Sequence, residues 1–319
     1  TLVRLATGLT LCAAALAAHA AGYPDRPVKW VVPFPPGGAM DSIARTLGEA
    51  MGRELGTAFI VENRAGAGGN IGAATVARSA PDGYTIMMAN IGSHSINYSL
   101  YKKLPYTPDD FIAITLVISN PNILVVNSST PFTTVPELIA AIKKDPNLYS
   151  FGSAGAGQSP HLSGEMFMQR TGIQVPHIPY KGAGPATGAL LGNQFTFMIA
   201  TAPSVMAQIK GGKLRALAVT SDVRAPELPN VPTMAEAGVP NMLVTAWFGL
   251  FAPAATPQAI INRLQQATVK VLNTADIQNR FKEMGGVAGG NSPAEFNTFV
   301  RAEIANWKQT VEAAKLSLE

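Results

Sequence analysis

The feature that most constrains this 319-residue chain is a regular alternation of short apolar runs with amphipathic segments, joined by glycine-rich loops. The runs have the length and composition of buried strands, and the segments that follow them have the periodicity of helices. Such an alternation is typical of parallel sheets with helices on both faces. The sequence therefore predicts an α/β protein.

The predicted strands are residues 29–32, 59–61, 85–89, 112–117, 123–126, 149–151, 175–178, 195–199, 214–220 and 245–251. The predicted helices cover residues 41–55, 135–144 and 203–209, end near residues 77, 170 and 191, and begin near residues 257, 274 and 293. Thr134 with Glu137, and Ser292 with Glu295, have the spacing of capping boxes.

Glycine-rich loops join several predicted strands to the helices that follow, as in residues 33–40, 152–159 and 180–185. In doubly wound folds these loops lie at the carboxyl ends of the strands, where ligands bind. Each following helix presents free N–H groups and the positive end of its dipole. Glycine also lets a ligand approach the backbone closely. The loops therefore predict a carboxylate site that needs no arginine.

The candidate ligand-binding residues come from these loops and from the polar segments after strands 85–89 and 195–199. They are Phe34, Gly37, Gly38, Ala39, Met40, Asp41, Gly92, Ser93, His94, Ser153, Ala154, Gly155, Gly157, His161, Gly182, Ala183, Ala200 and Thr201. Phe34 is expected to form an apolar wall of the cleft, with the core as its alternative position. His94 is expected either to donate to a ligand oxygen or to be a solvated loop residue.

Three kinds of chemistry are disfavoured by the motifs. The stretch 152–155 misses the G-x-S-x-G elbow of serine hydrolases, although His161 follows Ser153 closely. His161 and Glu165 lie one helical turn apart, but the chain has no H-E-x-x-H motif. Residues 155–160 break the dinucleotide fingerprint at its last glycine, and no Walker lysine follows a glycine loop. We expect no enzymatic activity, metal or cofactor, and a loop-anchoring role for His161.

Residues 1–20 have the order of features found in a secretory signal peptide. Arg4 precedes a short apolar run, and Ala18-His19-Ala20 fits the cleavage site. The only cysteine, Cys12, lies in this segment after Leu11, which is a poor lipobox residue. A mature chain without cysteine suits an oxidising periplasm. We therefore expect a periplasmic protein without disulfides.

The composition is that of an ordinary globular protein. It is 47% hydrophobic and 14% charged, with a formal net charge of +4. The basic residues are scattered, without the clustered basic and aromatic residues of nucleic-acid-binding proteins. We therefore expect no nucleic-acid partner.

Ordered motifs run along the whole mature chain. They are Tyr23-Pro24-x-Arg26-Pro27, residues 31–45 (VVPFPPGGxxDxxAR), 61–72 (VENRxGAGGNIG), 80–85 (APDGYT), 151–155 (FGSAG) with His161-Leu162, 179–182 (PYKG), 212–220 (GKLRALAVT) and 247–250 (WFGL). Together they resemble the Bug receptors, the periplasmic substrate-binding proteins of tripartite tricarboxylate transporters.

The resemblance implies a type II-like periplasmic-binding-protein fold. It has two α/β domains, each with a doubly wound and mostly parallel sheet, and a ligand cleft between them. Two chain crossings are expected near residues 120–122 and 245–247. Domain 1 then comprises residues 21–121 and 247–319, and domain 2 comprises residues 122–246.

The resemblance also implies how the ligand is held. In the family, backbone N–H groups and bridging water bind the carboxylate. Many relatives have an aspartate where this chain has Ala200, which favours a plain carboxylate over an amino acid. Arg45 and Lys181 are the nearest candidate cations, and both are expected to be structural.

These observations predict a monomeric periplasmic receptor that closes over a small organic carboxylate. Dicarboxylates, tricarboxylates and aromatic acids all remain candidate ligands, and membrane transporter subunits are the expected partners. One alternative is a receptor that presents its liganded domains to a sensor kinase. The other is a hydrolase on the same fold.

Overall fold

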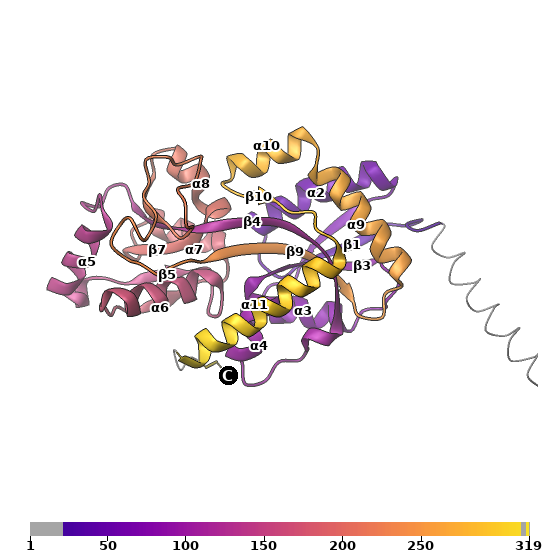
Figure 1. The fold of residues 1–319 in the computed structure, drawn as a ribbon, viewed down its shortest axis with the longest axis horizontal. Coiled ribbons are helices and arrows are strands. Elements are labelled where there is room, and N and C mark those ends of the chain that lie inside the picture. Colours follow the sequence, from indigo (N-terminus) through magenta and orange to yellow (C-terminus); the bar gives the residue numbers. More distant parts are fainter. Residues whose placement is uncertain (1–21, 314–316, 319) are drawn as a thin grey trace, which may run out of the picture.

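The computed structural model describes residues 22–313 and 317–318, so the predicted signal peptide lies outside the described residues. Two α/β lobes are joined by two long strands that run side by side from one lobe into the other (Figure 1). Within the described residues, no helix combines the length and the apolar character needed to cross a membrane.

The first lobe is built on a mixed sheet. Its strands are β2 (Phe59–Asn63), β1 (Val28–Val32), β3 (Thr85–Asn90), β9 (Thr245–Pro253), β4 (Phe111–Asn127) and β10 (Val287–Ala288). Its helices are α2 (Ala39–Leu55), α3 (Asn70–Ala77), α4 (Asn97–Leu100), α9 (Gln258–Leu272), α10 (Ala275–Glu283) and α11 (Pro293–Ala313). β1 is parallel to both β2 and β3, as the strand–helix alternation predicts.

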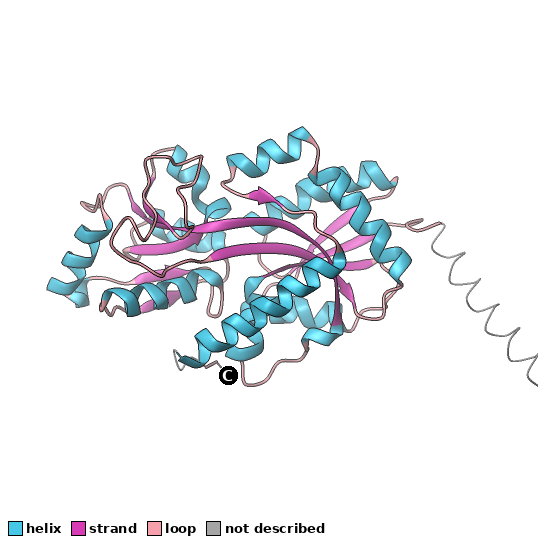
Figure 2. Cartoon of the chain, viewed as in Figure 1, coloured by secondary structure: helices cyan, strands magenta, loops and turns pink. Residues whose placement is uncertain are grey.

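The second lobe repeats this plan. Its strands are β5 (Phe151–Ser153), β6 (His177–Pro179), β7 (Phe197–Thr201) and β8 (Leu214–Val219). Its helices are α5 (Val135–Lys144), α6 (Ser159–Thr171), α7 (Ala183–Leu191) and α8 (Ala202–Lys210). β5 is parallel to β6 and β7, whereas β7 and β8 pair antiparallel with the second half of β4. Helices lie on both sides of the strands in each lobe (Figure 2).

Successive side chains along a strand point to opposite faces of the sheet. In each lobe, the apolar side chains on both faces are buried under helices. In β1, Trp30 and Val32 pack with α2 and α9, whereas Val31 packs with the cluster around α3 and α11. In the second half of β4, Leu124 faces the cluster around α5 and α6, and Ile123 faces the one around α7 and α8. Each lobe therefore has two apolar cores, one on each side of its sheet.

The strands predicted at 112–117 and 123–126 form one continuous strand, β4. The polar stretch between them remains paired with the neighbouring strand β9. Pro121 still faces Thr245 of β9, and the next residue, Asn122, faces Thr201 of β7. The backbone N–H of Asn122 also donates to the Thr220 hydroxyl over 2.8 Å. The change of pairing partner thus occurs at residues 121–122. β4 and β9 run antiparallel to their neighbours, which the alternation alone did not predict.

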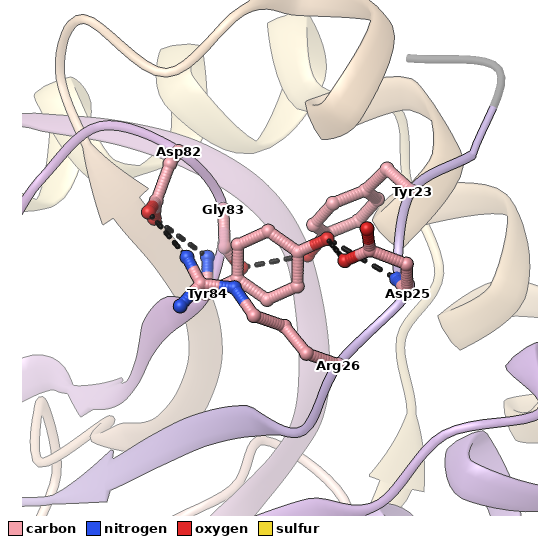
Figure 3. Close-up of polar contacts among 6 residues, drawn as sticks. All are labelled: Tyr23, Asp25, Arg26, Asp82, Gly83 and Tyr84. Carbon is pink, nitrogen blue, oxygen red and sulfur yellow. Dashed lines mark hydrogen bonds and ion pairs between the residues drawn. The ribbon is translucent and has the colours of Figure 1, made fainter. Parts of the chain in front are cut away.

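The first described residues are fixed to the turn that precedes β3 (Figure 3). The Tyr23 hydroxyl donates to the Gly83 carbonyl over 2.6 Å, and Arg26 pairs with Asp82 over 3.0 Å. The Arg26 guanidinium also lies 4.0 Å from the centre of the Tyr84 ring. Two of the motifs that carry the family resemblance therefore contact each other, and their role here is to anchor the chain.

Candidate functional site between the lobes

A cavity lies where the two lobes meet, at the carboxyl ends of β1, β3, β5, β6 and β7. It is lined by Phe34, Pro35, Gly38, Ala39, Met40, Asp41, Asn90, Ile91, Ala154, Gln158, Ser159, Pro160, Gly182, Ala183, Gly184, Pro185, Thr201, Ser204, Ala246 and Phe248. Its volume is about 50 Å³, and an adjoining hollow of about 430 Å³ shares five of these residues. Most of the lining side chains are apolar.

Four helices begin at the wall of this cavity. The residues that precede the first turns of α2, α6, α7 and α8 are Gly38, Gln158, Gly182 and Thr201, and all four line the cavity. None of the four has a side chain that caps its helix. The first-turn N–H groups have no partner inside their own helix, and each helix carries about half a positive charge at this end. Such a wall favours an anion.

Within the part of the chain that the structure describes, Asp41 is the only residue lining the cavity that has an ionisable side chain. It accepts hydrogen bonds from the Gly37 N–H over 3.0 Å and from Asn63 over 3.0 Å, and it pairs with Arg45 over 2.9 Å. Burial would raise its pKa, but the hydrogen bonds from Arg45, Gly37 and Asn63 outweigh burial and lower the pKa of this carboxyl group. The carboxylate therefore fixes the loop before α2 and does not repel a bound anion as an unpaired charge would.

Gln158 connects the lobes directly beside the cavity. Its amide oxygen accepts from the Asn90 side chain over 2.7 Å, and its amide nitrogen donates to the Gly68 carbonyl over 2.7 Å. A Cβ atom at Gly92 would lie 2.4 Å from the Gln158 amide oxygen. Gly92 thus leaves room for this contact between the lobes, although it does not line the cavity itself.

A buried cluster of polar and aromatic side chains supports the loop between β5 and α6. The Gly157 N–H donates to Nδ1 of His161 over 3.1 Å, and Ser153 Oγ lies 2.7 Å from Nε2 of His177. The two imidazole rings stack with their centres 4.1 Å apart. Burial, and then the neighbouring His161, lower the pKa of His177 to about 3. His161 therefore anchors the loop, which is one of the two roles expected for it.

The serine–histidine contact has an environment unlike that of a hydrolase nucleophile. Ser153 is fully buried, and neither it nor His177 lines the cavity. Ser153 Oγ instead accepts from the N–H of Gly155 over 3.2 Å. The contact fixes the turn of the loop, and the hydroxyl is buried outside the cavity lining.

His94 lies in neither of the positions expected for it. Its side chain is only 1% exposed, and its ring packs against Phe111 and Phe251, each with ring centres 4.4 Å apart. Burial lowers its pKa to about 3. The segment after β3 turns inward as a single wide helical turn, Gly92–Ile96, so that His94 joins the apolar core of the first lobe. The glycine and serine residues around it gave no sign of this inward turn.

Half of the sequence-predicted site residues line the cavity. They are Phe34, Gly38, Ala39, Met40, Asp41, Ala154, Gly182, Ala183 and Thr201. Phe34 also packs against the core of the first lobe, so both positions expected for it are combined. The others lie outside the lining: Gly37, Gly92, Ser93, His94, Ser153, Gly155, Gly157, His161 and Ala200. Arg45 and Lys181 also lie outside it.

Several lining residues were absent from the predicted set. Five of them lie at strand ends and helix starts, where the strand–loop–helix pattern could have indicated a binding site: Asn90, Ile91, Gln158, Ser159 and Pro160. Ala246 and Phe248 lie on β9, which reaches the cavity because it crosses between the lobes. The motif at residues 247–250 and the crossing expected near residues 245–247 were the signals that could have identified them.

Comparisons with family models, with curated proteins and with solved structures all give the same receptor family. The TctC family model, described as a tripartite tricarboxylate transporter family receptor, matches residues 43–316. Protein BugT of Bordetella pertussis is 35% identical over 316 residues, which cover 98% of this chain and 97% of BugT. The structure of the periplasmic binding protein BugD is similar with a TM-score of 0.89 and 37% identity, covering 93% of this chain and 100% of BugD.

Two similar structures contain ligands. Rpa4515 of R. palustris, solved with adipate, has a TM-score of 0.90 and 34% identity, and the match covers 92% of this chain and 99% of Rpa4515. MatC of Rhodopseudomonas palustris, solved with malate, has a TM-score of 0.86 and 31% identity, and the match covers 91% of this chain and 100% of MatC.

Proposed function

Because the chain belongs to the TctC family of tripartite tricarboxylate transporter receptors, we propose that it captures a small organic carboxylate between its lobes and delivers it to a membrane transporter. The observation that carries this proposal is the convergence of four helix starts without side-chain caps on one cavity. Relatives solved with adipate and with malate support the same ligand class.

The proposed binding mode follows from the charges around the cavity. Among the described residues that line it there is no lysine, arginine or histidine, so backbone N–H groups and helix dipoles are the positive groups nearest to the ligand. We infer that one carboxylate lies against the starts of α2, α7 and α8, with α6 closing the site through Gln158. Closure bends the two crossing strands near residues 120–122 and 245–247, which form the boundary between domains 21–121 plus 247–319 and 122–246. Both lobes contribute to the wall, so the ligand is enclosed as the lobes approach each other.

This arrangement supports a receptor rather than an enzyme. The buried Ser153–His177 contact lies outside the cavity lining, and Asp41 is held by Arg45, Asn63 and the Gly37 N–H. Neither is positioned as a nucleophile or a general base toward a ligand in the cavity. We propose a periplasmic receptor without catalytic activity.

Paired ligands that differ only in charge test the proposal. Mature protein, unfolded and refolded to remove any retained ligand, is titrated calorimetrically with a panel of carboxylates and with their carboxamides. We expect at least one carboxylate to bind while its neutral carboxamide does not. At a hundred times its dissociation constant, that carboxylate stabilises the fold by about 2.7 kcal/mol. Equal binding of acid and amide, or no binding by any carboxylate, would contradict the proposal.

A further inference from the structure

The hollow beside the cavity is large enough to hold most of a ligand. The cavity itself, about 50 Å³, is far below the range of about 300–1,000 Å³ that is typical of ligand pockets, whereas the hollow is about 430 Å³. The two spaces share five residues at the starts of α2, α7 and α8: Gly38, Ala39, Ala183, Gly184 and Ser204. These are the helix starts at which we place the carboxylate, so a ligand held there has room to extend into the hollow.

One side of α8 runs along the hollow. The residues of α8 that line it have the spacing of three and four residues that places side chains on one side of a helix, and they are Pro203, Ser204, Met206, Ala207 and Lys210. Ser204 also lines the cavity, and Lys210 lies about 9 Å further along the helix axis. α8 therefore leads from the proposed position of the carboxylate to Lys210.

Lys210 supplies a positive charge to this hollow. Among the described residues that line it, Lys210 and Glu283 are the two with ionisable side chains. The Lys210 ammonium group donates to the backbone carbonyl of Glu283 over 2.8 Å, and neither side chain forms an ion pair with another described residue. An ammonium group has three N–H donors, so two remain for a ligand after this bond. The bond joins α8 to α10 and so holds the charge between the two lobes.

From these positions we infer that Lys210 binds the second carboxylate of a dicarboxylate whose first carboxylate lies at the helix starts. The inference rests on the proposed carboxylate-receptor function. An extended chain spans about 1.2 Å per bond, so the carboxyl carbons of a six-carbon diacid lie about 6 Å apart, and a hydrogen bond of about 3 Å completes the span to Lys210. A four-carbon diacid is shorter by about 2.4 Å. The receptor therefore selects diacids of six or more carbons over shorter diacids and over monocarboxylates of the same length.

Acids matched in carbon number test this inference. One pair is adipate and hexanoate, the other is succinate and butyrate, and within each pair only the second carboxylate changes. Calorimetric titration of the refolded protein is expected to show adipate binding about fivefold more tightly than hexanoate, which is the upper end for an exposed ion pair. The difference should be smaller between succinate and butyrate, because the second carboxylate of succinate does not reach Lys210.

Substitution of Lys210 tests which group binds the second carboxylate. Lys210→Gln removes the charge, and the ratio of adipate affinity to hexanoate affinity should fall from about fivefold to about one. A looser contact between the lobes would weaken the binding of both acids alike, so the ratio isolates the effect of the charge. Lys282→Gln is the control, because Lys282 is exposed on α10 and lines neither the hollow nor the cavity. Circular dichroism and melting temperatures verify that the variants fold.

Removing the opposing charge of the hollow gives the reciprocal test, since Glu283→Gln should raise the same ratio. Equal binding of adipate and hexanoate by the unmodified protein, or an unchanged ratio in Lys210→Gln, would overturn the inference and leave the carboxylate receptor standing. A lower ratio in Glu283→Gln would also count against it. Failure of every carboxylate in the acid and amide panel would overturn the proposed function, and the inference with it.

Discussion

At the scale of single residues, the site depends on side chains that hold the backbone of its loops in place. Asp41 is an example, since its carboxylate holds the Gly37 N–H, Asn63 and Arg45 at the start of α2. His161 does the same for the loop before α6, through its bond from the Gly157 N–H. In the proposed binding mode, the ligand contacts N–H groups whose directions these side chains fix.

Removing the charge of Asp41 should weaken ligand binding. Asp41→Asn keeps the size of the side chain but loses the ion pair with Arg45 and weakens the bond from Gly37, so the loop before α2 is less ordered. We expect a loss of about tenfold in affinity, because hydrogen bonds to a charged group contribute about 1.5–3 kcal/mol. Calorimetric titration with the preferred carboxylate measures this loss.

The matched control for this substitution is Asp276→Asn on α10. Asp276 also pairs with an arginine four residues later, Arg280, over 3.0 Å, but the pair is exposed and does not line the cavity. Its affinity should equal that of the unmodified protein. Equal losses in the two variants would show that the effect does not come from the loop before α2.

The buried histidines make the fold sensitive to acid. Burial lowers the pKa of His94 to about 3, whereas an unfolded histidine has a pKa near 6.5. Between these values the unfolded chain binds a proton that the folded chain does not, so stability is fully present above about pH 6.5 and declines as the pH falls toward 3. His177, whose pKa is also lowered to about 3, contributes in the same direction.

Urea unfolding at a series of pH values from 7.5 to 4.5 measures this dependence. Each such histidine contributes up to about 1.4 kcal/mol per pH unit within the window. His94→Phe suits the aromatic surroundings formed by Phe111 and Phe251 and should make the dependence shallower. The same slope in His94→Phe and the unmodified protein would contradict the assignment to His94.

At the scale of secondary-structure elements, the contact between α6 and the first lobe closes the site. The Gln158 amide bonds to Asn90 at the end of β3 and to the Gly68 carbonyl. A third bond between the lobes joins Lys210, at the end of α8, to the Glu283 carbonyl of α10 over 2.8 Å. The enclosed state therefore has hydrogen bonds of its own in addition to those made by a ligand.

Truncating Gln158 should shift the protein toward open forms. Gln158→Ala removes both bonds from α6 to the first lobe, and we expect ligand affinity to fall about tenfold, as two neutral hydrogen bonds of about 1 kcal/mol each allow. The radius of gyration of the ligand-free protein, from small-angle X-ray scattering, should increase. Gln169→Ala, at an exposed position on the helix that follows Gln158, is the control. An unchanged affinity would refute the closing role of Gln158.

Local patterns predicted most elements of this fold, and the exceptions have physical reasons. The capping boxes at Thr134 and Ser292 form as predicted, because they depend only on residues three apart. β4 was predicted as two strands, since asparagine and proline are poor strand formers, yet pairing with β9 and Thr220 keeps it continuous. Tertiary contacts determine such a strand, and no local pattern contains them.

The site was predictable to the extent that it follows strand ends and helix starts. Gly38, Gly182 and Thr201 were identified in this way, because each directly precedes a helix. Phe248 was missed because it reaches the cavity only through the crossing of β9 between the lobes. His94 was expected either in the cleft or in a solvated loop, and its position in the core was missed because the inward turn after β3 has no local signature.

At the scale of the whole molecule, the two lobes are joined by two crossing strands, by the contacts around the cavity and by Leu162 of α6, which belongs to the apolar cluster around α3 and α11. β4 pairs with β9 over residues 111–121 and with β7 and β8 from residue 122 onward, and the proposed hinge lies at this change of partner (Figure 1). α2 lies in the first lobe, whereas α6, α7 and α8 lie in the second. A ligand that bridges these helix starts is therefore bound by both lobes at once.

The most direct test of this account is the response of the backbone amides to a carboxylate, measured by two-dimensional nitrogen–proton NMR of the isotopically labelled protein. We predict that the largest shifts occur at first-turn amides from both lobes, including Ala39, Ala183 and Ala202. The matching carboxamide should leave these signals in place. Shifts confined to one lobe, or centred away from these helix starts, would contradict the claim that the helix ends bind the anion between the lobes.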